Sequence, residues 1–141
     1  MALIPAINEL IILKETRPYR LQGTSPSDFA ITSVVPTTSG VGGASLSGAV
    51  FAGDDVYYLS RSGFIALSTV QNFGDLKSRR PSDRISPYFE TDSAYRLYRL
   101  DAALVMYDDT TNRIFIAVDT TGDGLNDYML IYDLALGAWS T

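Results

Sequence analysis

Short apolar runs separated by turn-forming residues recur along most of the chain, and this spacing limits the folds open to it. The run VYYLS (56–60) is followed by Arg61-Ser62-Gly63 and then by FIALS (64–68). Glycine supplies the positive φ that a tight hairpin turn needs, and runs of about five residues match the usual strand length. The alternation of side chains suits half-buried strands. The pattern therefore predicts an all-β chain built from hairpins.

The predicted strands fall into groups that each repeat strand, turn, strand, turn, strand. The groups cover residues 9–35, 48–68 and 103–141, with strands expected at 9–15, 19–23, 29–35, 48–53, 56–60, 64–68, 103–108, 113–119, 127–134 and 138–141. Repeated antiparallel meanders are the unit of a β-propeller, and a β-sandwich is the alternative. Propellers normally have about four to eight blades, so the two to three blades expected here need a ring completed by a larger chain or by oligomerisation. We therefore expect residues 1–141 to be a single β-propeller portion.

Two segments lack the strand pattern. Residues 36–48 are rich in Gly, Ser and Thr, which fits a flexible linker or, as we favour, a surface connection between strand groups. Residues 69–96 mix charges with two prolines and are expected to form an irregular insertion between blades. One helical turn with Ser82 as its N-cap fits this segment, whereas Pro87 would disrupt a longer helix.

The chain has no cysteine and no histidine, which excludes several kinds of chemistry. Disulfides, thiol nucleophiles, Ser-His-Asp triads and zinc sites built on Cys or His all need one of these residues. A metal site would have to use oxygen ligands, which favours calcium or magnesium. The net charge of −5 argues against nucleic-acid binding, and the apolar run LIIL (10–13) is too short to cross a membrane.

Two pairs of adjacent carboxylates, Asp54-Asp55 and Asp108-Asp109, lie at predicted turns. Acid–base catalysis would need both carboxylates of a pair to face one substrate, whereas neighbouring residues on a turn point apart. Both pairs fit ordinary turn chemistry. We therefore expect a protein that is not an enzyme and has no catalytic residues.

The stretch DTTGDGLND (119–127) concentrates acidic residues and glycines between two predicted strands. Alternate positions of such a loop can deliver the roughly six to eight oxygens that calcium prefers. The candidate ligands are Asp119, Thr121, Asp123, the Leu125 carbonyl and Asp127. The flanks are strands, and Leu130 stands where an EF-hand has its glutamate, so the loop is not an EF-hand. The alternative is a hairpin tip whose Asp and Asn side chains bond their own backbone.

This loop resembles the D-x-x-G-D-G-x-x-D loops of FG-GAP repeats, as in integrin-type propellers, and of bacterial calcium-binding repeats. Thr121 departs from that pattern, which usually has Asn or Asp at this position. The resemblance implies calcium as the cofactor. It also implies one alternative function, in which a propeller binds carbohydrate or a cell-surface receptor with calcium; a glycan-acting enzyme on the same fold is another.

The order of features along the whole chain resembles the β-propeller structural proteins of tailed bacteriophages, found in tail, nozzle and adaptor components. The resemblance is carried by ELIILKETRPYRLQGTSPSDFAITSVV (9–35), GAVFAGDDVYYLSRSGFIALS (48–68), FGDLKSRRPSDRISPYF (73–89), NRIFIAVD (112–119) and MLIYDLALGAWS (129–140). It implies a virion structural protein of the tail or the head–tail junction, made in the host cytoplasm. Its implied partners are other virion structural proteins and copies of itself, with no membrane and no specific nucleic acid.

Overall fold

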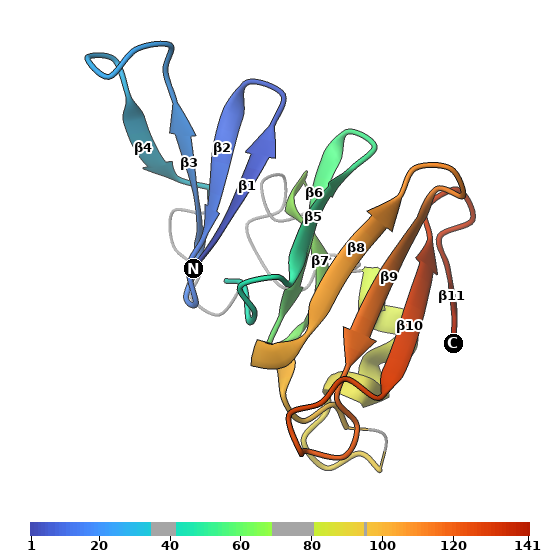
Figure 1. Ribbon diagram of the computed structural model, residues 1–141. Coiled ribbons are helices and arrows are strands. Elements are labelled where there is room, and N and C mark those ends of the chain that lie inside the picture. Colours follow the sequence, from blue (N-terminus) through green and yellow to red (C-terminus); the bar gives the residue numbers. More distant parts are fainter. Residues whose placement is uncertain (35–41, 69–80, 95) are drawn as a thin grey trace.

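The computed structural model describes residues 1–34, 42–68, 81–94 and 96–141. These residues form three antiparallel meander sheets that lie side by side (Figure 1). The N-terminal sheet consists of β1 (Ala2–Ala6), β2 (Glu9–Leu13), β3 (Pro18–Gln22) and β4 (Ala30–Ser33); the middle sheet of β5 (Ala49–Ala52), β6 (Asp55–Ser60) and β7 (Gly63–Ala66); and the C-terminal sheet of β8 (Leu104–Asp108), β9 (Arg113–Val118), β10 (Tyr128–Asp133) and β11 (Ala138–Ser140). Two 3₁₀ helices, η1 (Pro81–Phe89) and η2 (Leu100–Ala102), precede the C-terminal sheet. The prediction of an all-β chain of hairpins is confirmed.

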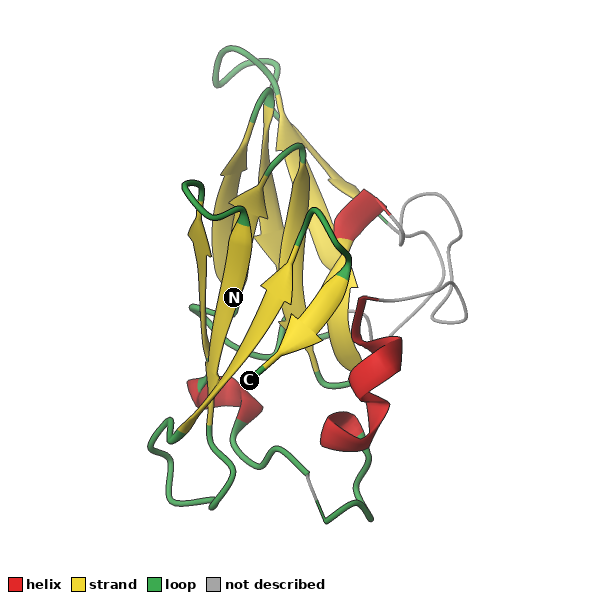
Figure 2. Cartoon of the chain, turned by 90° about the vertical axis from the view of Figure 1, so that its right-hand side faces the viewer, coloured by secondary structure: helices red, strands yellow, loops and turns green. Residues whose placement is uncertain are grey.

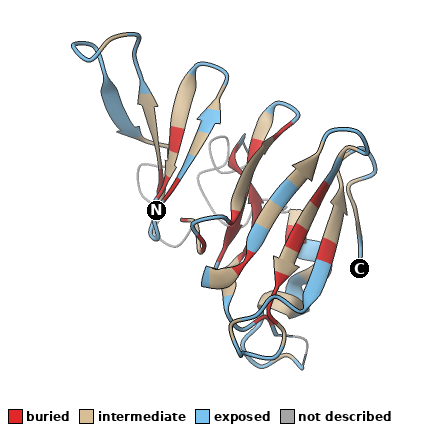
Figure 3. Cartoon of the chain, in the orientation of Figure 1, coloured by how far each residue is buried: buried red, intermediate tan, exposed pale blue. Residues whose placement is uncertain are grey.

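The middle sheet is buried on both faces, because its strands are apolar at nearly every position. In β6, Val56 and Tyr58 belong to the core shared with the N-terminal sheet, whereas Leu59 belongs to the core shared with the C-terminal sheet. In β7, Ile65 belongs to the core shared with the N-terminal sheet and Phe64 to the core shared with the C-terminal sheet. The molecule is therefore a stack of three layers with one core on each side of the middle layer (Figure 3). Figure 2 looks along this stack, so the sheets overlap in that view.

The three sheets meet through their first strands. β1 lies against β5, and β5 lies against β8. The later strands of the two end sheets diverge from this seam, so that β4 and β11 form outer edges (Figure 1). Within the described residues, none of the sheets closes on itself.

The strand β1 was not predicted from the sequence. Pro5 lowers the expectation of a strand, because proline has no N–H to give to a ladder. An edge strand tolerates this residue, and β1 is the edge of the N-terminal sheet, where Pro5 pairs with Leu10 of β2. The N-terminal group therefore has four strands, one more than the sequence predicted.

The described end of the Gly-rich segment, residues 42–48, joins the three sheets. Its backbone forms hydrogen bonds with Lys14 after β2, Leu59 in β6 and Val105 in β8. Gly42 approaches its neighbours so closely that an added Cβ would stand 2.0 Å from the Lys14 carbonyl oxygen. The glycine is thus required by close packing.

The predicted surface connection is therefore confirmed only in part for residues 42–48, where Leu46 and Ser47 are exposed but the rest is buried or half-buried. Gly42 and Gly48 are buried, and the Ser45 hydroxyl donates a buried hydrogen bond to the Ala103 carbonyl at 2.6 Å. The remainder of that prediction falls on residues 36–41, outside the described residues.

The helix η1 packs on β7 and is kinked at Ile85, where φ is −120° and ψ is 27°. Pro87 lies inside it, two residues beyond the kink, so the helix accommodates the proline by breaking its regular geometry. This helix lies in the predicted irregular insertion 69–96, of which residues 69–80 and 95 are outside the described residues.

Ser82 does not act as the predicted N-cap. Its buried hydroxyl donates to the Phe64 carbonyl at 3.2 Å and accepts from the Phe64 N–H at 3.0 Å. Both peptide groups of Phe64 face away from β6, on the outer edge of the middle sheet. Ser82 therefore provides hydrogen-bond partners for the backbone N–H and carbonyl at the free edge of β7, a strand 18 residues earlier in the sequence.

Candidate functional site

The acidic loop, residues 119–127, connects β9 to β10 and is organised by the Asp119 carboxylate. Asp119 is only 1% exposed. Its oxygens accept hydrogen bonds from the N–H groups of Thr121 at 2.9 Å, Gly122 at 2.6 Å and Gly124 at 2.7 Å. Gly122 and Gly124 have φ values of 88° and 87°, which favour glycine and allow these N–H groups to converge.

Two opposing effects set the pKa of Asp119. Burial raises the pKa, because desolvation disfavours the charged form, whereas the N–H groups of Gly122, Gly124 and Thr121 lower it. The hydrogen bonds together outweigh burial, so the pKa lies below the ordinary value of 3.8. Asp119 is therefore ionised at neutral pH and holds the loop as a charged group.

The other candidate ligands also bond within the acidic loop. Asp127 accepts from the Thr120 N–H at 2.8 Å and from the Thr120 hydroxyl at 2.9 Å. Asp123 accepts from the Leu125 N–H at 2.8 Å, and the Leu125 side chain is exposed. Each carboxylate is thus directed to a different group of the loop itself.

The fit of calcium to this loop depends on whether its oxygens converge. In the described ranges, no group of three or more acidic side chains is placed to hold a metal ion. The N–H groups on Asp119 present positive charge, and the Arg99 guanidinium, bonded to Asp101, lies near Gly124. In this arrangement the carboxylates accept hydrogen bonds from the loop's own groups, which is what the hairpin-tip alternative predicts, and calcium binding stays a prediction.

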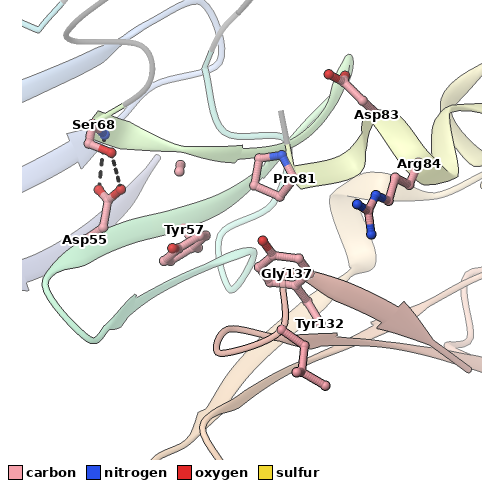
Figure 4. A pocket seen from close by; sticks show the side chains of 10 residues that line it. Asp55, Tyr57, Ser68, Pro81, Asp83, Arg84, Tyr132 and Gly137 are labelled. Carbon is pink, nitrogen blue, oxygen red and sulfur yellow. Dashed lines mark hydrogen bonds between the residues drawn. The ribbon is translucent and has the colours of Figure 1, made fainter. Parts of the chain in front are cut away.

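A pocket of about 450 Å³ lies between the middle and C-terminal sheets (Figure 4). Its lining includes Asp55, Tyr57 and Ser68 from the middle sheet side, with Arg84 of η1 and Tyr132 of β10 opposite. The Asp55 carboxylate accepts hydrogen bonds from the N–H and the hydroxyl of Ser68 (Figure 4). The Asp55 carboxylate therefore ties the start of β6 to Ser68, which follows β7.

The chemistry of this pocket is that of packed aromatic rings. The centroids of the Tyr57 and Tyr132 rings are 6.3 Å apart. Burial, together with nearby Asp55, raises the pKa of Tyr57 to about 12, and burial also raises the pKa of Tyr132. Such phenols stay neutral at pH 7 and are poor bases. The described lining therefore offers no activated nucleophile.

The C-terminal sheet is apolar on both sides. One side, which includes Ile114, Ile116 and Leu130, is buried against the middle sheet. The other side, which we name the C-terminal face, carries two rows of apolar side chains across β8, β9 and β10. The rows are Leu104, Ala117 and Met129, and Met106, Phe115 and Ile131. Leu104 and Met106 are 51% and 62% exposed, so the face is open.

The N-terminal sheet has a similar outward side, which we name the N-terminal face. Its apolar rows are Leu3, Ile12 and Tyr19, and Pro5, Leu10, Leu21 and Ile31. The side chains of Leu3 and Ile31 are 53% and 64% exposed. Contiguous exposed apolar surface is a common feature of the places where proteins bind one another.

These two faces were not predicted from the sequence. The spacing of Ile114, Ile116 and Val118 predicts that they share one buried side of the strand at 113–119, but it says nothing of the residues between them. The available signal was the lack of alternation: RIFIAV (113–118) and YMLIY (128–132) are apolar at nearly every position. Such runs are typical of strands buried on both faces.

These features define an all-β chain of three antiparallel sheets with open apolar faces at both ends. No protein-family model matches the chain, and no curated protein matches its sequence. In the part of the chain that the structure describes, no helix is long and apolar enough to cross a bilayer.

Proposed function

We propose that the chain is a non-enzymatic structural segment of a β-propeller that packs against neighbouring sheets in a virion. The observation that carries the proposal is the pair of open apolar faces at the two ends of the stack. Apolar faces of sheets have to be covered, because leaving them in water forfeits the free energy of burial and invites aggregation.

The arrangement of the three sheets supports a propeller. Successive blades of a propeller are antiparallel meanders whose first strands surround a central axis. Here the sheets pack face to face and touch through β1, β5 and β8, in chain order. In this proposal the three sheets are three consecutive blades, and the end faces are the places where the next blades dock.

The absence of enzymatic activity in this proposal has two supports among the described residues. The carboxylates of the acidic loop are bonded to their own loop, and Asp55 in the pocket is bonded to Ser68. None of these four carboxylates lies free beside a matching base, which general acid–base catalysis requires.

The proposed location is the phage tail or the head–tail junction, as a nozzle-like or adaptor-like component. Its support is the resemblance of the segment order to β-propeller proteins of tailed bacteriophages. The partners are then other virion structural proteins and copies of this chain, assembled after synthesis in the host cytoplasm.

Analysis of purified virions tests this proposal. Quantitative mass spectrometry is expected to find the chain at a fixed copy number per particle, and immunogold electron microscopy to label the tail or its junction with the head. Infectious particles that lack the chain would refute a structural role in the virion.

A further inference from the structure

We propose that this chain assembles with a second copy of itself, with the C-terminal face of one copy packed on the N-terminal face of the other. The inference rests on the proposed function and names the partner of its two open faces. The contact is heterologous, because two different surfaces meet, so it can repeat around a closed ring.

The two faces correspond in their arrangement of side chains. On the C-terminal face, each apolar row runs across β8, β9 and β10; on the N-terminal face, each runs across β1, β2 and β3 and one continues to β4. Both sheets begin with an inner strand, β8 or β1, that carries highly exposed residues: Met106 on one and Leu3 on the other. Two faces with two apolar rows each can cover one another.

The packing within the chain provides the pattern for this contact. The N-terminal sheet packs on the middle sheet, and the middle sheet packs on the C-terminal sheet, each time through successive first strands. An N-terminal sheet placed after the C-terminal sheet continues this order without a new kind of contact. Two copies then give six sheets, which lies within the range of about four to eight blades that closed propellers use.

Charge at one end of the faces favours unlike pairing. Lys14 follows β2 and lies over the Tyr19 ring at 5.1 Å from its centroid, which places its ammonium on the N-terminal face. Asp127 directly precedes β10 and is exposed. It is two residues before Met129, so it belongs to the same side of the sheet, the C-terminal face. Both lie at the end of their sheets where β2 joins β3 and β9 joins β10 (Figure 1).

The opposite end of the C-terminal face adds to this preference. Its last row contains Asp108, Arg113 and Asp133, so two carboxylates surround one guanidinium. Two C-terminal faces would bring these acidic rows and Asp127 onto the same interface, which disfavours like pairing. When unlike faces pair, Lys14 of one copy instead lies opposite Asp127 of the other copy.

The end of the stack where β2 joins β3 already has an ion pair between neighbouring sheets of one chain. Arg61, in the turn between β6 and β7, contacts Glu15, in the turn between β2 and β3, at 2.7 Å. Both side chains are well exposed, so this pair contributes little stability, and its value is in orienting adjacent sheets. Lys14 and Asp127 would repeat the arrangement between copies.

Sedimentation velocity of the full chain between about 1 and 100 μM tests the proposal with four variants. Leu3→Asp places a charge on the N-terminal face, and Met106→Asp places one on the C-terminal face. Ile7→Asp and Leu136→Asp are the matched controls, because both residues are 76% exposed in turns outside the faces. Circular dichroism checks that every variant keeps its fold.

The wild type and both controls are expected to sediment as a closed dimer of about 31 kDa, twice the 15.4 kDa of the chain. Leu3→Asp and Met106→Asp are each expected to weaken the dimer at least about tenfold, because each charges an apolar contact. An equimolar mixture of these two variants is expected to form a 1:1 complex, since one supplies an intact C-terminal face and the other an intact N-terminal face.

Two outcomes would overturn the inference. If like faces paired, each face variant alone would still dimerise through its unaltered face, and mixing would add nothing. If the wild type stayed monomeric at the highest concentration, the second copy would not be the partner. A monomeric wild type would leave the proposed function standing if purified virions contained the chain. If virions lacked the chain, the proposed function would fail as well.

Discussion

At the scale of single residues, the Ser82 hydroxyl joins η1 to the middle sheet. It serves both peptide groups of Phe64, and Ser82 is 3% exposed. Ser82→Ala leaves a buried N–H and a buried carbonyl without this partner, so we expect the free energy of unfolding to fall by about 1–3 kcal/mol. Urea denaturation followed by Trp139 fluorescence measures the change.

Ser86 provides the matched control for that prediction. It lies in the same helix and its side chain is exposed, so Ser86→Ala should change the unfolding free energy by less than about 0.5 kcal/mol. Equal effects of the two substitutions would contradict the structural role of the Ser82 hydroxyl.

Asp119 gives the acidic loop a dependence on pH. Its folded-state pKa is lowered below 3.8, so its contribution to stability is fully present above that pH and is lost as the pH falls through the folded-state value. Asp119→Asn is therefore expected to lower the urea midpoint at about pH 7, and the difference from the wild type should shrink by about pH 2.5.

The comparison with Asp123→Asn isolates this effect. Asp123 is exposed and accepts one N–H bond, so its substitution should have a much smaller effect at neutral pH. Asp28, whose pKa is lowered to about 2 by the N–H groups of Ser25 and Thr24, loses its contribution in acid in all three proteins and cancels in the comparison. A difference that persisted unchanged at low pH would show that charge is not the cause.

Calcium binding by the acidic loop is tested separately. Because the carboxylates are already bonded to loop N–H groups, we expect no binding heat at about 5 mM calcium and no rise in Tm. Binding heat that Asp123→Asn abolishes would instead support the calcium-dependent alternative, a propeller that binds carbohydrate or a cell-surface receptor. A glycan array with and without chelator would then identify its ligand.

At the scale of elements, the segment 42–48 is held by close approach of backbones. A Cβ on Gly42 would lie 2.0 Å from the Lys14 carbonyl oxygen and 2.4 Å from the Glu15 carbonyl. Gly42→Ala must displace backbone, and we expect a loss of about 1–3 kcal/mol in unfolding free energy. Ser47→Ala, at an exposed side chain of the same segment, is the control, and a similar loss there would argue against steric conflict.

The strands that sequence reasoning predicted are those whose determinants are local. The hairpin of β6 and β7 follows from alternation around a glycine turn, and Ile114, Ile116 and Val118 are buried as their spacing predicts. β1 was missed because Pro5 is tolerated only at an edge, and edge position depends on the other strands.

Parts of the candidate sites could not be predicted because their partners are distant in sequence. Ser82 has the local features of an N-cap, yet it bonds Phe64, and Ser45 bonds Ala103. The hairpin tip at residues 119–127 was one of two alternatives, and the sequence alone did not fix the direction of the Asp119 carboxylate. Predicting the two open faces would require knowing which side of each end sheet the middle sheet covers, and the sequence does not show this.

At the scale of the whole molecule, the middle sheet belongs to both cores, so the three layers should unfold together. Ile11 is fully buried in the core between the N-terminal and middle sheets, whereas Trp139 packs against the other core. Ile11→Ala is expected to cost about 2–5 kcal/mol and to move the Trp139 fluorescence transition by the same amount as the circular dichroism transition.

Ile116→Ala is the counterpart in the core that contains Trp139, since Ile116 is equally buried. It should also give a single transition seen equally by both probes. If Ile11→Ala left the Trp139 transition in place while circular dichroism changed, the end sheets would be separate cooperative units.

The hydrogen bonds of residues 42–48 also order events during synthesis. The segment bonds to Lys14, which is made before it, and to Val105, which is made much later. A nascent chain therefore cannot complete the seam until β8 has left the ribosome, and contacts of such long sequence separation form slowly. Until then the side of the middle sheet that the C-terminal sheet covers lies open to solvent, and such exposed apolar surface makes a partly synthesised chain prone to aggregation.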